Sequence, residues 1–389
     1  MIRILALTST RSDYDLMSAV YRALHEDPAV ELRLLVSGAH LSPQFGSTVD
    51  LIRKDGFELL SEAETLISGD SKTSRLKTAS NLLSSAIDLV RTYSPNVMIF
   101  AGDREDVLIA ATIGAFLGIP TVHFFGGDHA TDGHVDNPVR HATSKLSTTH
   151  FVSIEQHRQR LLCLGEDDRR IFVIGSVALD KFLSEPTLER QTVLKGVGAK
   201  SHAMTSSLAV LIFHPVDQEH EVAPEFVRSG VETLIEQGFH VLIGAPNPDP
   251  GNQQLMETMH ALNLCPEVTY YGNISRANFV NLMRHADLMI GNSSAGILEA
   301  ASVGLPVINL GERQRGRLAG RNVIFCDENR ASLKDALREM QGEAFKAGMA
   351  TLSNPYGDGH SAVKAAQLLT SIPFSKLIKK TEDPLHARQ

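Results

Sequence analysis

Short apolar runs alternate with amphipathic stretches along most of the chain. In the first half, the apolar runs are rich in β-branched and aliphatic residues and fall at residues 2–7, 31–36, 97–101, 121–125, 150–152 and 171–174. The stretches between them space their apolar residues as a helix does, at residues 14–25, 76–92, 106–117 and 155–164. Strands that alternate with helices in this way predict a parallel sheet covered by helices on both faces.

The second half repeats this alternation. Its apolar runs fall at residues 208–213, 240–243, 268–270, 288–290, 306–309 and 323–325, and its helical patterns at 224–237, 252–262, 275–284 and 332–340. Polar residues and two glycines interrupt the pattern around residues 186–207. We therefore predict an α/β protein with two Rossmann-like, doubly wound domains, residues 1–185 and 186–358. Such folds bind ligands at the carboxyl ends of their strands, so we expect the site in the cleft between the two domains.

Composition narrows the class of protein. A chain of 389 residues is long for one hydrophobic core and suits two domains. The net charge of −8 argues against nucleic-acid and membrane-surface partners, which need basic faces. The three cysteines lie far apart without CxxC spacing, which indicates a reducing compartment and no cysteine-built metal site. Since no membrane-spanning run and no signal-peptide pattern is present, we expect a cytoplasmic protein.

One segment of the second half combines the features of an anion-binding turn. Residues 291–299, with the sequence GNSSAGILE, follow an apolar run and open a helical pattern over residues 297–303. The N–H groups at a helix start and the hydroxyls of Ser293 and Ser294 can bind a phosphate, and Gly296 lets it approach the backbone closely. Glu299 is placed to accept hydrogen bonds from ribose hydroxyls. The alternative is an ordinary strand-to-helix turn with serine as its N-cap.

Polar side chains also follow two other strands of this half. His214 ends one strand, where it can contact a phosphate or lie buried and satisfied in the core. Asn247 and Asp249 lie in a Pro-rich polar loop after the next strand, as expected at the edge of a ligand site.

Arginines in two strand-end turns are candidate phosphate ligands. Residues 313–317 read RQRGR, and Arg313 and Arg317 can neutralise a diphosphate, although a solvated basic turn has the same composition. Arg11 follows the first strand and can fork onto a phosphate, or it can be a surface arginine near a helix start.

Three carboxylates follow successive strands or open helices in the first half. Asp103, Asp128 and Asp136 are candidates for general acid and base work, and helix capping is the alternative for Asp103 and Asp136. The paired glycines at 126–127 suggest close backbone approach or positive φ beside Asp128. A metal site is the rival interpretation, but the nearby histidines have no spacing of a known ligand motif.

Taken together, these motifs resemble the hydrolysing UDP-N-acetylglucosamine 2-epimerases, of the sialic- and legionaminic-acid pathway type, rather than their non-hydrolysing relatives. The resemblance covers nearly the whole chain in matching order. It rests on TRSDY at 10–14, SGAHL at 37–41, GDR at 102–104, GGD at 126–128, RH at 140–141, GS at 175–176, GNSSAGILEA at 291–300, GLPVINLG at 304–311 and RQRGR at 313–317.

The resemblance implies a glycosyltransferase-B-like fold, in which a C-terminal helix within residues 359–389 crosses back onto the first domain. It implies UDP bound mainly by the second domain, no metal or redox cofactor, and a homodimer or homotetramer. By the matching motifs, the catalytic residues would be Asp103, Asp128, Asp136 and His214. The substrate-binding residues would be Arg11, His40, Arg140, Asn247, Asp249, Ser293, Ser294, Gly296, Glu299, Arg313 and Arg317.

The implied reaction converts UDP-N-acetylglucosamine and water to N-acetylmannosamine and UDP, by elimination to a 2-acetamidoglucal and hydration. One residue departs from the family pattern, because Asp128 stands where the family usually has Glu. The shorter side chain withdraws the carboxylate by about 1.5 Å. A UDP-2,4-diacetamido-2,4,6-trideoxy sugar, as in legionaminic acid synthesis, is therefore the alternative substrate. A glycosyltransferase of the same fold and a nucleotide-sugar sensor are the alternative functions.

Overall fold

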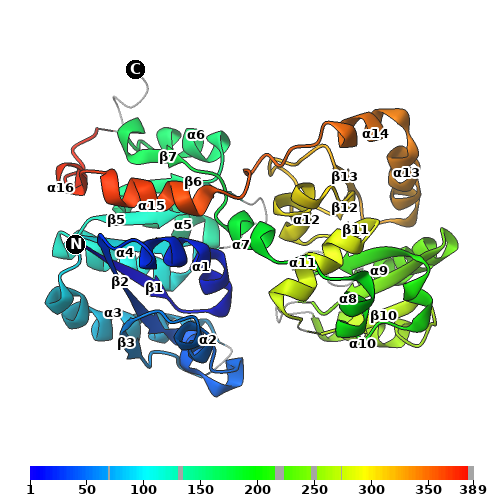
Figure 1. Ribbon diagram of the computed structural model, residues 1–389, viewed down its shortest axis with the longest axis horizontal. Helices are drawn as coiled ribbons and strands as arrows, with labels where there is room; N and C mark the ends of the chain where they lie inside the picture. Colours follow the sequence, from blue (N-terminus) through cyan, green and yellow to red (C-terminus); the bar gives the residue numbers. More distant parts are fainter. Residues whose placement is uncertain (69–70, 130–134, 215–222, 247–251, 273, 384–389) are drawn as a thin grey trace. The chain divides into compact units, whose positions relative to one another are not determined.

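The computed structural model describes residues 1–68, 71–129, 135–214, 223–246, 252–272 and 274–383. They form two compact units (Figure 1). Unit 1 consists of the described residues up to Lys181 together with those from Tyr356 onwards, and unit 2 consists of Phe182–Pro355. Each unit is built around one parallel sheet. The predicted fold class, two parallel-sheet α/β domains of the glycosyltransferase-B type, is confirmed.

The sheet of unit 1 has the strand order β3-β2-β1-β4-β5-β6-β7. Its strands are β1 (Ile2–Thr8), β2 (Val30–Ser37), β3 (Leu59–Ala63), β4 (Val97–Ala101), β5 (Thr121–Phe124), β6 (Thr149–Val152) and β7 (Ile171–Val173). Its helices are α1 (Arg11–His25), α2 (Val49–Lys54), α3 (Lys72–Tyr93), α4 (Glu105–Leu117), α5 (Asp136–Leu146), α6 (Glu155–Cys163), α15 (Ser361–Ser371) and α16 (Phe374–Leu377). Helix α7 (Ala178–Ser184) leads from unit 1 into unit 2.

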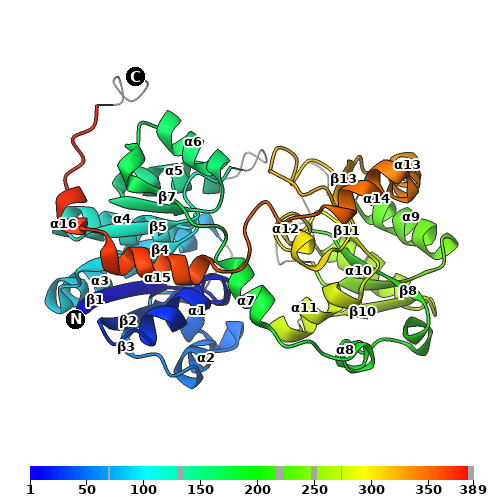
Figure 2. The same cartoon turned by 45° about the horizontal axis from the view of Figure 1, so that its top comes forward.

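Helices cover both faces of this sheet because its central strands are apolar on both sides. Ile4 and Ala6 of β1 face the cluster built with α1 and α15, while Leu5 and Leu7 face the cluster built with α3 and α4. Helix α15 packs along α1 in Figure 2 and in the contacts of unit 1. The Asp180 carboxylate accepts the N–H groups that begin α15, at 3.1 and 2.8 Å.

The sheet of unit 2 has the strand order β10-β9-β8-β11-β12-β13. Its strands are β8 (Ser207–Ile212), β9 (Phe239–Gly244), β10 (Val268–Tyr271), β11 (Leu288–Gly291), β12 (Val307–Leu310) and β13 (Val323–Cys326). Its helices are α8 (Arg190–Gly196), α9 (Ala223–Glu236), α10 (Asn252–Leu262), α11 (Arg276–His285), α12 (Ser294–Leu298), α13 (Arg330–Gln341) and α14 (Glu343–Ala350).

The direction of strand succession reverses once in each sheet. The reversal lies between β1 and β4 in unit 1 and between β8 and β11 in unit 2. Ligands of open α/β sheets bind outside the carboxyl ends of the strands at such a point. The residues that follow these four strands are therefore the first place to search for a site.

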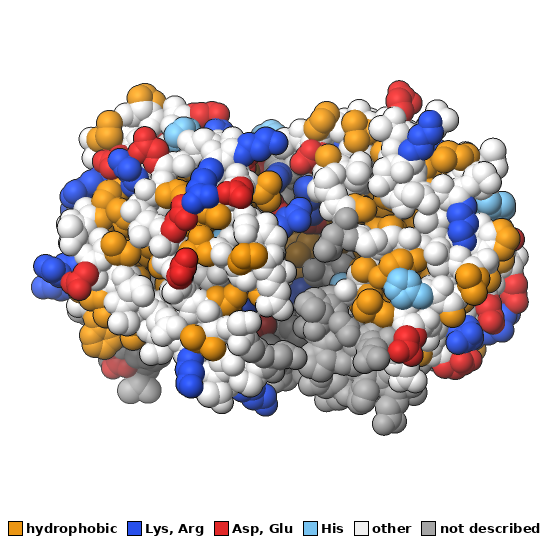
Figure 3. Space-filling model, turned by 90° about the horizontal axis from the view of Figure 1, so that it is seen from below, with side chains coloured by type: hydrophobic (Ala, Val, Ile, Leu, Met, Phe, Trp, Pro, Cys, Tyr) orange, Lys and Arg blue, Asp and Glu red, His pale blue; other side chains and the backbone are white. Residues whose placement is uncertain are grey.

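The surface carries both signs of charge. On the face shown in Figure 3, acidic and basic side chains are interspersed over each unit. Within the part of the chain that the structure describes, no helix is long and apolar enough to cross a membrane.

Candidate functional site

In unit 2, the turn after β11 is fixed by a backbone that only glycine accepts. Gly291 has φ +131°, and a Cβ at this position would lie 1.9 Å from the carbonyl oxygen of Ile212 in β8. The next residue donates its N–H to the same oxygen at 3.1 Å. The carboxyl ends of β8 and β11 are thereby held together at the reversal point of the sheet.

Asn292 joins three strand-end loops of unit 2, and sequence reasoning did not single it out. Its buried side-chain amide bonds the backbone of His214 in both directions, at 2.7 and 2.8 Å. The backbone carbonyl oxygen of Asn292 accepts hydrogen bonds from the side chains of Arg313 at 2.9 Å and Gln314 at 3.1 Å. Arg317 in turn donates to the Gln314 amide oxygen at 3.0 Å. His214, Arg313 and the serine turn are therefore gathered at one edge of the sheet.

His214 is held in its neutral form at physiological pH. Burial, and then the positive charge of Arg313, lower the pKa of His214 to about 4. A neutral imidazole can donate a hydrogen bond to an anion or accept a proton, but it adds no positive charge of its own. Arg313 therefore supplies the fixed charge at this edge.

Ser293 has the capping role that the sequence offered as its alternative. It is the N-cap of α12, and its hydroxyl oxygen accepts the N–H of Ala295 at 3.3 Å. Ser294 is the first residue of the helix. A Cβ on Gly296 would come within 2.9 Å of Val307 in β12, so close helix–strand packing explains this glycine. Phosphate binding by the three residues stays a prediction.

Glu299 lies at the end of α12 and is paired with a residue that sequence reasoning missed. The predicted continuous helix over residues 297–303 is replaced by α12 followed by a 3₁₀ turn, Ala300–Val303. The carboxylate of Glu299 is buried and forms an ion pair with Arg276 of α11, at 2.8 Å. Arg276 opens the helix after β10, a strand end at which the sequence predicts no functional residue.

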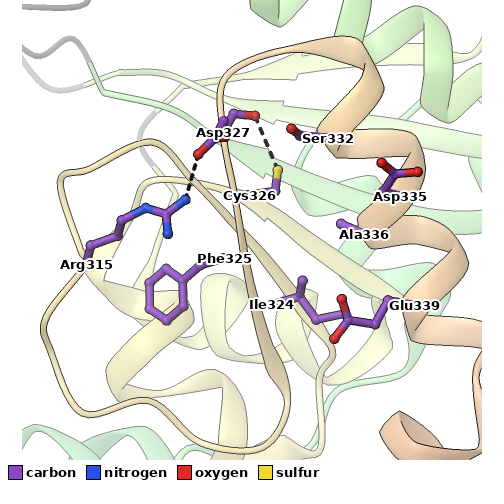
Figure 4. Close-up of a pocket in the computed structure, with 9 residues that line it drawn as sticks. All are labelled: Arg315, Ile324, Phe325, Cys326, Asp327, Ser332, Asp335, Ala336 and Glu339. Atoms are coloured by element: carbon purple, nitrogen blue, oxygen red, sulfur yellow. Dashed lines mark hydrogen bonds and ion pairs between the residues drawn. The ribbon is translucent and has the colours of Figure 1, made fainter.

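The middle arginine of the RQRGR turn belongs to another feature. Arg315 pairs with Asp327 at 2.8 Å and lies beside Phe325, at the rim of a cavity of about 220 Å³ between β13 and α13 (Figure 4). Asp335 and Glu339 also line this cavity. Its carboxylates would repel a diphosphate, so we do not place the nucleotide here.

In unit 1, Arg140 joins one predicted carboxylate to the loop that carries another. Its guanidinium, which is 7% exposed, forms an ion pair with the Asp103 carboxylate and donates to the carbonyl oxygen of Asp128 at 3.0 Å. It also donates to the side chain of Asn137 at 3.4 Å. The sequence predicted that Arg140 binds substrate, and the structure shows it engaged in joining the loops after β4 and β5.

Asp128 stands on a backbone with an unusual conformation. Phe125 has φ +64°, which is uncommon for a bulky residue, and Gly127 has φ +74°. A Cβ on Gly127 would meet the carbonyl oxygen of His157 at 2.2 Å. Gly127 therefore has both the close backbone approach and the positive φ that the sequence suggests. The Asp128 carboxylate lies 3.4 Å from the His157 imidazole, a partner on α6 that the sequence did not reveal.

Asp136 opens α5, the helix that also carries Arg140. Val135 precedes it as the N-cap residue, so the capping alternative for Asp136 is not what the structure has. Its carboxylate lies 3.6 Å from Arg75 of α3, which pairs more closely with Glu105. Asp103 is likewise not a cap, because Arg104 holds that position on α4.

The two remaining binding candidates of unit 1 differ in access. Arg11 is the first residue of α1, is half-exposed and lies 3.5 Å from Asp15, so its guanidinium can reach a ligand. His40 is fully buried, and its ring nitrogens bond Thr8 at 2.9 Å and Thr48 at 2.7 Å. The structure thus gives His40 a supporting role behind the turn after β1, not a surface for direct ligand contact.

A further carboxyl, which sequence reasoning missed, lies beside the β1 and β4 strand ends. Asp106 of α4 is buried, and burial followed by the charge of Asp13 raises the pKa of Asp106 to about 6. Asp13 itself caps α1 through the backbone N–H groups of Ser9 and Thr10, both at 3.0 Å.

Asn247 and Asp249, the predicted loop residues, lie outside the described residues. Among the side chains that the structure describes, no group of three or more His, Cys, Asp or Glu is arranged to hold a metal ion.

Comparisons with known proteins identify the family and support the fold. The sequence profile of a family described as UDP-N-acetylglucosamine 2-epimerase matches residues 22–370. The chain is 34% identical to a UDP-N,N′-diacetylbacillosamine 2-epimerase (hydrolyzing) of Legionella pneumophila, over 98% of this chain and 99% of that protein. It is 30% identical to a GDP/UDP-N,N′-diacetylbacillosamine 2-epimerase (hydrolyzing) of Campylobacter jejuni, over 88% of each. A UDP-GlcNAc 2-epimerase structure from Neisseria meningitidis, bound to UDP-GlcNAc, superposes with a TM-score of 0.81 at 18% identity, over 95% of this chain and 100% of that one.

Proposed function

Because the chain belongs to the UDP-N-acetylglucosamine 2-epimerase family, we propose that it is a hydrolysing 2-epimerase of a UDP-activated acetamido sugar. The observation that carries the proposal is the Arg140 junction of unit 1, which gathers the Asp103 carboxylate and the Asp128 loop. Asp136 lies one helical turn before Arg140 on the same helix. Carboxylates carried by neighbouring strand-end loops suit a reaction that removes a proton from one face of a carbon and returns one to the other.

The chemistry needs an acid and a base but no redox step. A carboxylate takes the proton from C2 of the sugar, and those electrons form the C1=C2 double bond while the C1–O bond breaks toward UDP. Water then adds its oxygen to C1, and C2 receives a proton from the opposite face. The products are UDP and the free sugar with inverted C2. We assign the proton transfers to Asp103, Asp128 and Asp136.

The C2 proton is weakly acidic, so stabilisation of the departing diphosphate should be the largest catalytic contribution. Unit 2 offers donors of two kinds for this task. Arg313 supplies a fixed positive charge, while neutral His214 and the hydroxyls of Ser293 and Ser294 supply hydrogen bonds. Arg11 of unit 1 is a further candidate for the diphosphate.

For the sugar, we propose UDP-2,4-diacetamido-2,4,6-trideoxyglucose as the preferred substrate, which is UDP-N,N′-diacetylbacillosamine. Two observations favour it over UDP-N-acetylglucosamine. The related hydrolysing enzymes of Legionella and Campylobacter are named for this sugar. Asp128 has a side chain one methylene shorter than the Glu of the family pattern, and a different substrate sugar is one way to accommodate this change. UDP-N-acetylglucosamine, the substrate that the sequence motifs imply, is the second candidate.

The test is proton NMR of the purified protein in D₂O with each UDP-sugar in turn. We expect release of UDP and of the free 2-epimer carrying deuterium at C2, faster with the diacetamido sugar. If only UDP-N-acetylglucosamine turns over, the substrate proposal is wrong and the reaction class stands. Return of a UDP-linked epimer without free sugar would contradict the hydrolysing reaction.

The same experiment separates the proposal from a glycosyltransferase. A transferase needs an acceptor for turnover, whereas the hydrolysing reaction needs only water. Turnover without added acceptor, together with deuterium at C2, is a combination that simple transfer to water does not give, because transfer leaves the C2–H bond intact.

A further inference from the structure

The ion pair between Arg276 and Glu299 joins two strand-end loops of unit 2. Arg276 opens α11 after β10, and Glu299 ends α12 after β11. The two guanidinium nitrogens contact the two carboxylate oxygens separately, Nη2 to Oε1 at 2.8 Å and Nη1 to Oε2 at 3.4 Å. Glu299 is 7% exposed, and the function proposed above assigns no role to Arg276.

A buried carboxylate is costly unless it is paired, and Arg276 is the cation that pairs it. A two-pronged contact also fixes the plane of the carboxylate, which a single lysine ammonium would not do. A carboxylate has about four lone-pair positions. Arg276 occupies one on each oxygen, so each oxygen keeps a second position for another donor.

Arg276 is itself held in place by its surroundings. Its guanidinium carbon lies 5.3 Å from the ring centre of Phe182 and 5.9 Å from that of Phe279. The turn that carries it is capped by Ser275, whose hydroxyl accepts the N–H of Asn278 at 3.2 Å. The guanidinium thus has both a charged partner and an aromatic support, which limits its rotation.

We propose that Arg276 is a positioning residue that presents the Glu299 carboxylate to the two ribose hydroxyls of the bound nucleotide. The inference rests on the proposed function, in which the substrate is a uridine diphosphate sugar. It predicts that recognition of the ribose, not of the diphosphate, depends on Arg276. Without Arg276 the buried carboxylate would turn toward solvent or bind a proton, and either change removes an acceptor.

The test compares the binding of UDP and 2′-deoxy-UDP by calorimetry. We expect the unaltered protein to prefer UDP by about tenfold, as hydrogen bonds to a charged acceptor imply. In Arg276→Met this preference should fall to about one, mainly because UDP binds more weakly. Arg276→Lys should lie between them, since it keeps the charge and loses the fork. Arg338→Met, a surface arginine on α13 that is 74% exposed, is the matched control and should behave as the unaltered protein.

A double-mutant cycle with Glu299→Gln separates positioning from general damage to the fold. If Arg276 acts through Glu299, adding Arg276→Met to Glu299→Gln should change the UDP preference no further. If Arg276→Met does not fold, Arg276→Lys is combined with Glu299→Gln in the same way.

Three outcomes would overturn the inference. Arg276→Met could retain the preference, it could weaken UDP and 2′-deoxy-UDP equally, or the unaltered protein could show no preference at all. Each of these leaves the proposed reaction intact if UDP is still released from the sugar. Absence of any UDP binding would instead overturn the proposed function and the inference together.

Discussion

At the scale of single residues, Asp106 shows how burial moves the titration of a carboxyl group toward neutral pH. Its folded-state pKa of about 6 lies above the ordinary value of 3.8, so folding favours its protonated form. Its contribution to stability is therefore complete below about pH 4 and is lost as the pH rises through 6. We predict that Asp106→Asn, which keeps the shape without the charge, stabilises the protein at pH 7.5 by about 2 kcal/mol.

The measurement is urea unfolding of both proteins at pH 4.5 and pH 7.5. The gain from Asp106→Asn should be clearly smaller at the lower pH, because Asp106 is then mostly protonated in the folded protein. Asp88→Asn, an exposed carboxylate on α3, serves as the control and should change neither value by more than about 0.5 kcal/mol. Equal gains at both pH values would contradict the assignment.

Asp103 is one of the three carboxylates to which we assign the proposed proton transfers. We predict that Asp103→Asn lowers kcat by about 10²- to 10⁴-fold, as expected for loss of a general acid or base. The affinity for UDP, measured by calorimetry, should change by less than about threefold, because we propose that the nucleotide is bound by donors of unit 2. Comparable losses of turnover and UDP affinity would instead assign Asp103 to substrate binding.

The sequence predicted site residues that follow the central strands but not the partners that hold them. The sequence proposes Asp103, Asp128 and His214 because strand-end positions can be read directly from the apolar pattern. Their partners Arg140, His157 and Asn292 make contacts set by tertiary structure. For this reason the sequence does not predict the contacts of Arg140, and it does not single out His157 and Asn292.

At the scale of elements, the C-terminal segment beyond α15 is fastened to the helix that carries Asp136 and Arg140. Lys380 donates to the carbonyl oxygens at the end of α5, those of Ser144, Lys145 and Ser147, at 2.9 to 3.3 Å. Its ammonium also pairs with the fully buried Glu166. Burial alone would raise the pKa of Glu166, but bonds from His150 and the charge of Lys380 lower it to about 2.

We predict that Lys380→Met destabilises the protein by about 2 kcal/mol, less than for a fully isolated charge, because Lys145 and His150 still pair with Glu166. Limited proteolysis should then cut the C-terminal segment earlier than in the unaltered protein. Lys376→Met on α16, an exposed lysine, is the matched control and should leave both readouts unchanged. Unfolding curves that coincide for all three proteins would mean that the contacts of Lys380 contribute nothing to stability.

Elements with a clear burial pattern were predictable, and those without one were not. The strand predicted at residues 97–101 is β4 residue for residue, since all five of its side chains are buried. Strand β3 was missed because it lies at the edge of its sheet and buries only Ala63 fully. The helix expected at residues 297–303 breaks at Glu299, whose carboxylate pairs with Arg276 in another loop. No local pattern records that pairing.

At the scale of the whole molecule, the sheets of the two units share one topology. Both sheets place their first three strands in reverse order and then continue on the other side of the first strand. The alternation of apolar and amphipathic segments predicts this class because right-handed crossovers between parallel strands leave few other arrangements. The two units differ in the side chains at their strand ends, where unit 1 carries carboxylates and unit 2 carries hydroxyls, His214 and Arg313, and we propose that their functions differ accordingly.

This division of chemistry predicts which parts of the chain respond to which ligand. UDP alone should protect unit 2 segments from amide hydrogen exchange, at residues 212–214, 291–299 and 311–317. The segments 101–104 and 125–129 of unit 1 should change little with UDP, because they carry carboxylates that a diphosphate repels.

The complete UDP-sugar should protect the unit 1 segments as well, since the sugar is the part that the carboxylates act on. The measurement is hydrogen exchange by mass spectrometry, with Asp103→Asn used to prevent turnover during labelling. Inorganic diphosphate is the control ligand and should protect residues 291–294 and 311–317 without affecting residue 299, which is assigned to the ribose. Equal protection of both units by UDP alone would contradict the division, because the diphosphate would then be bound by the carboxylate-bearing unit too.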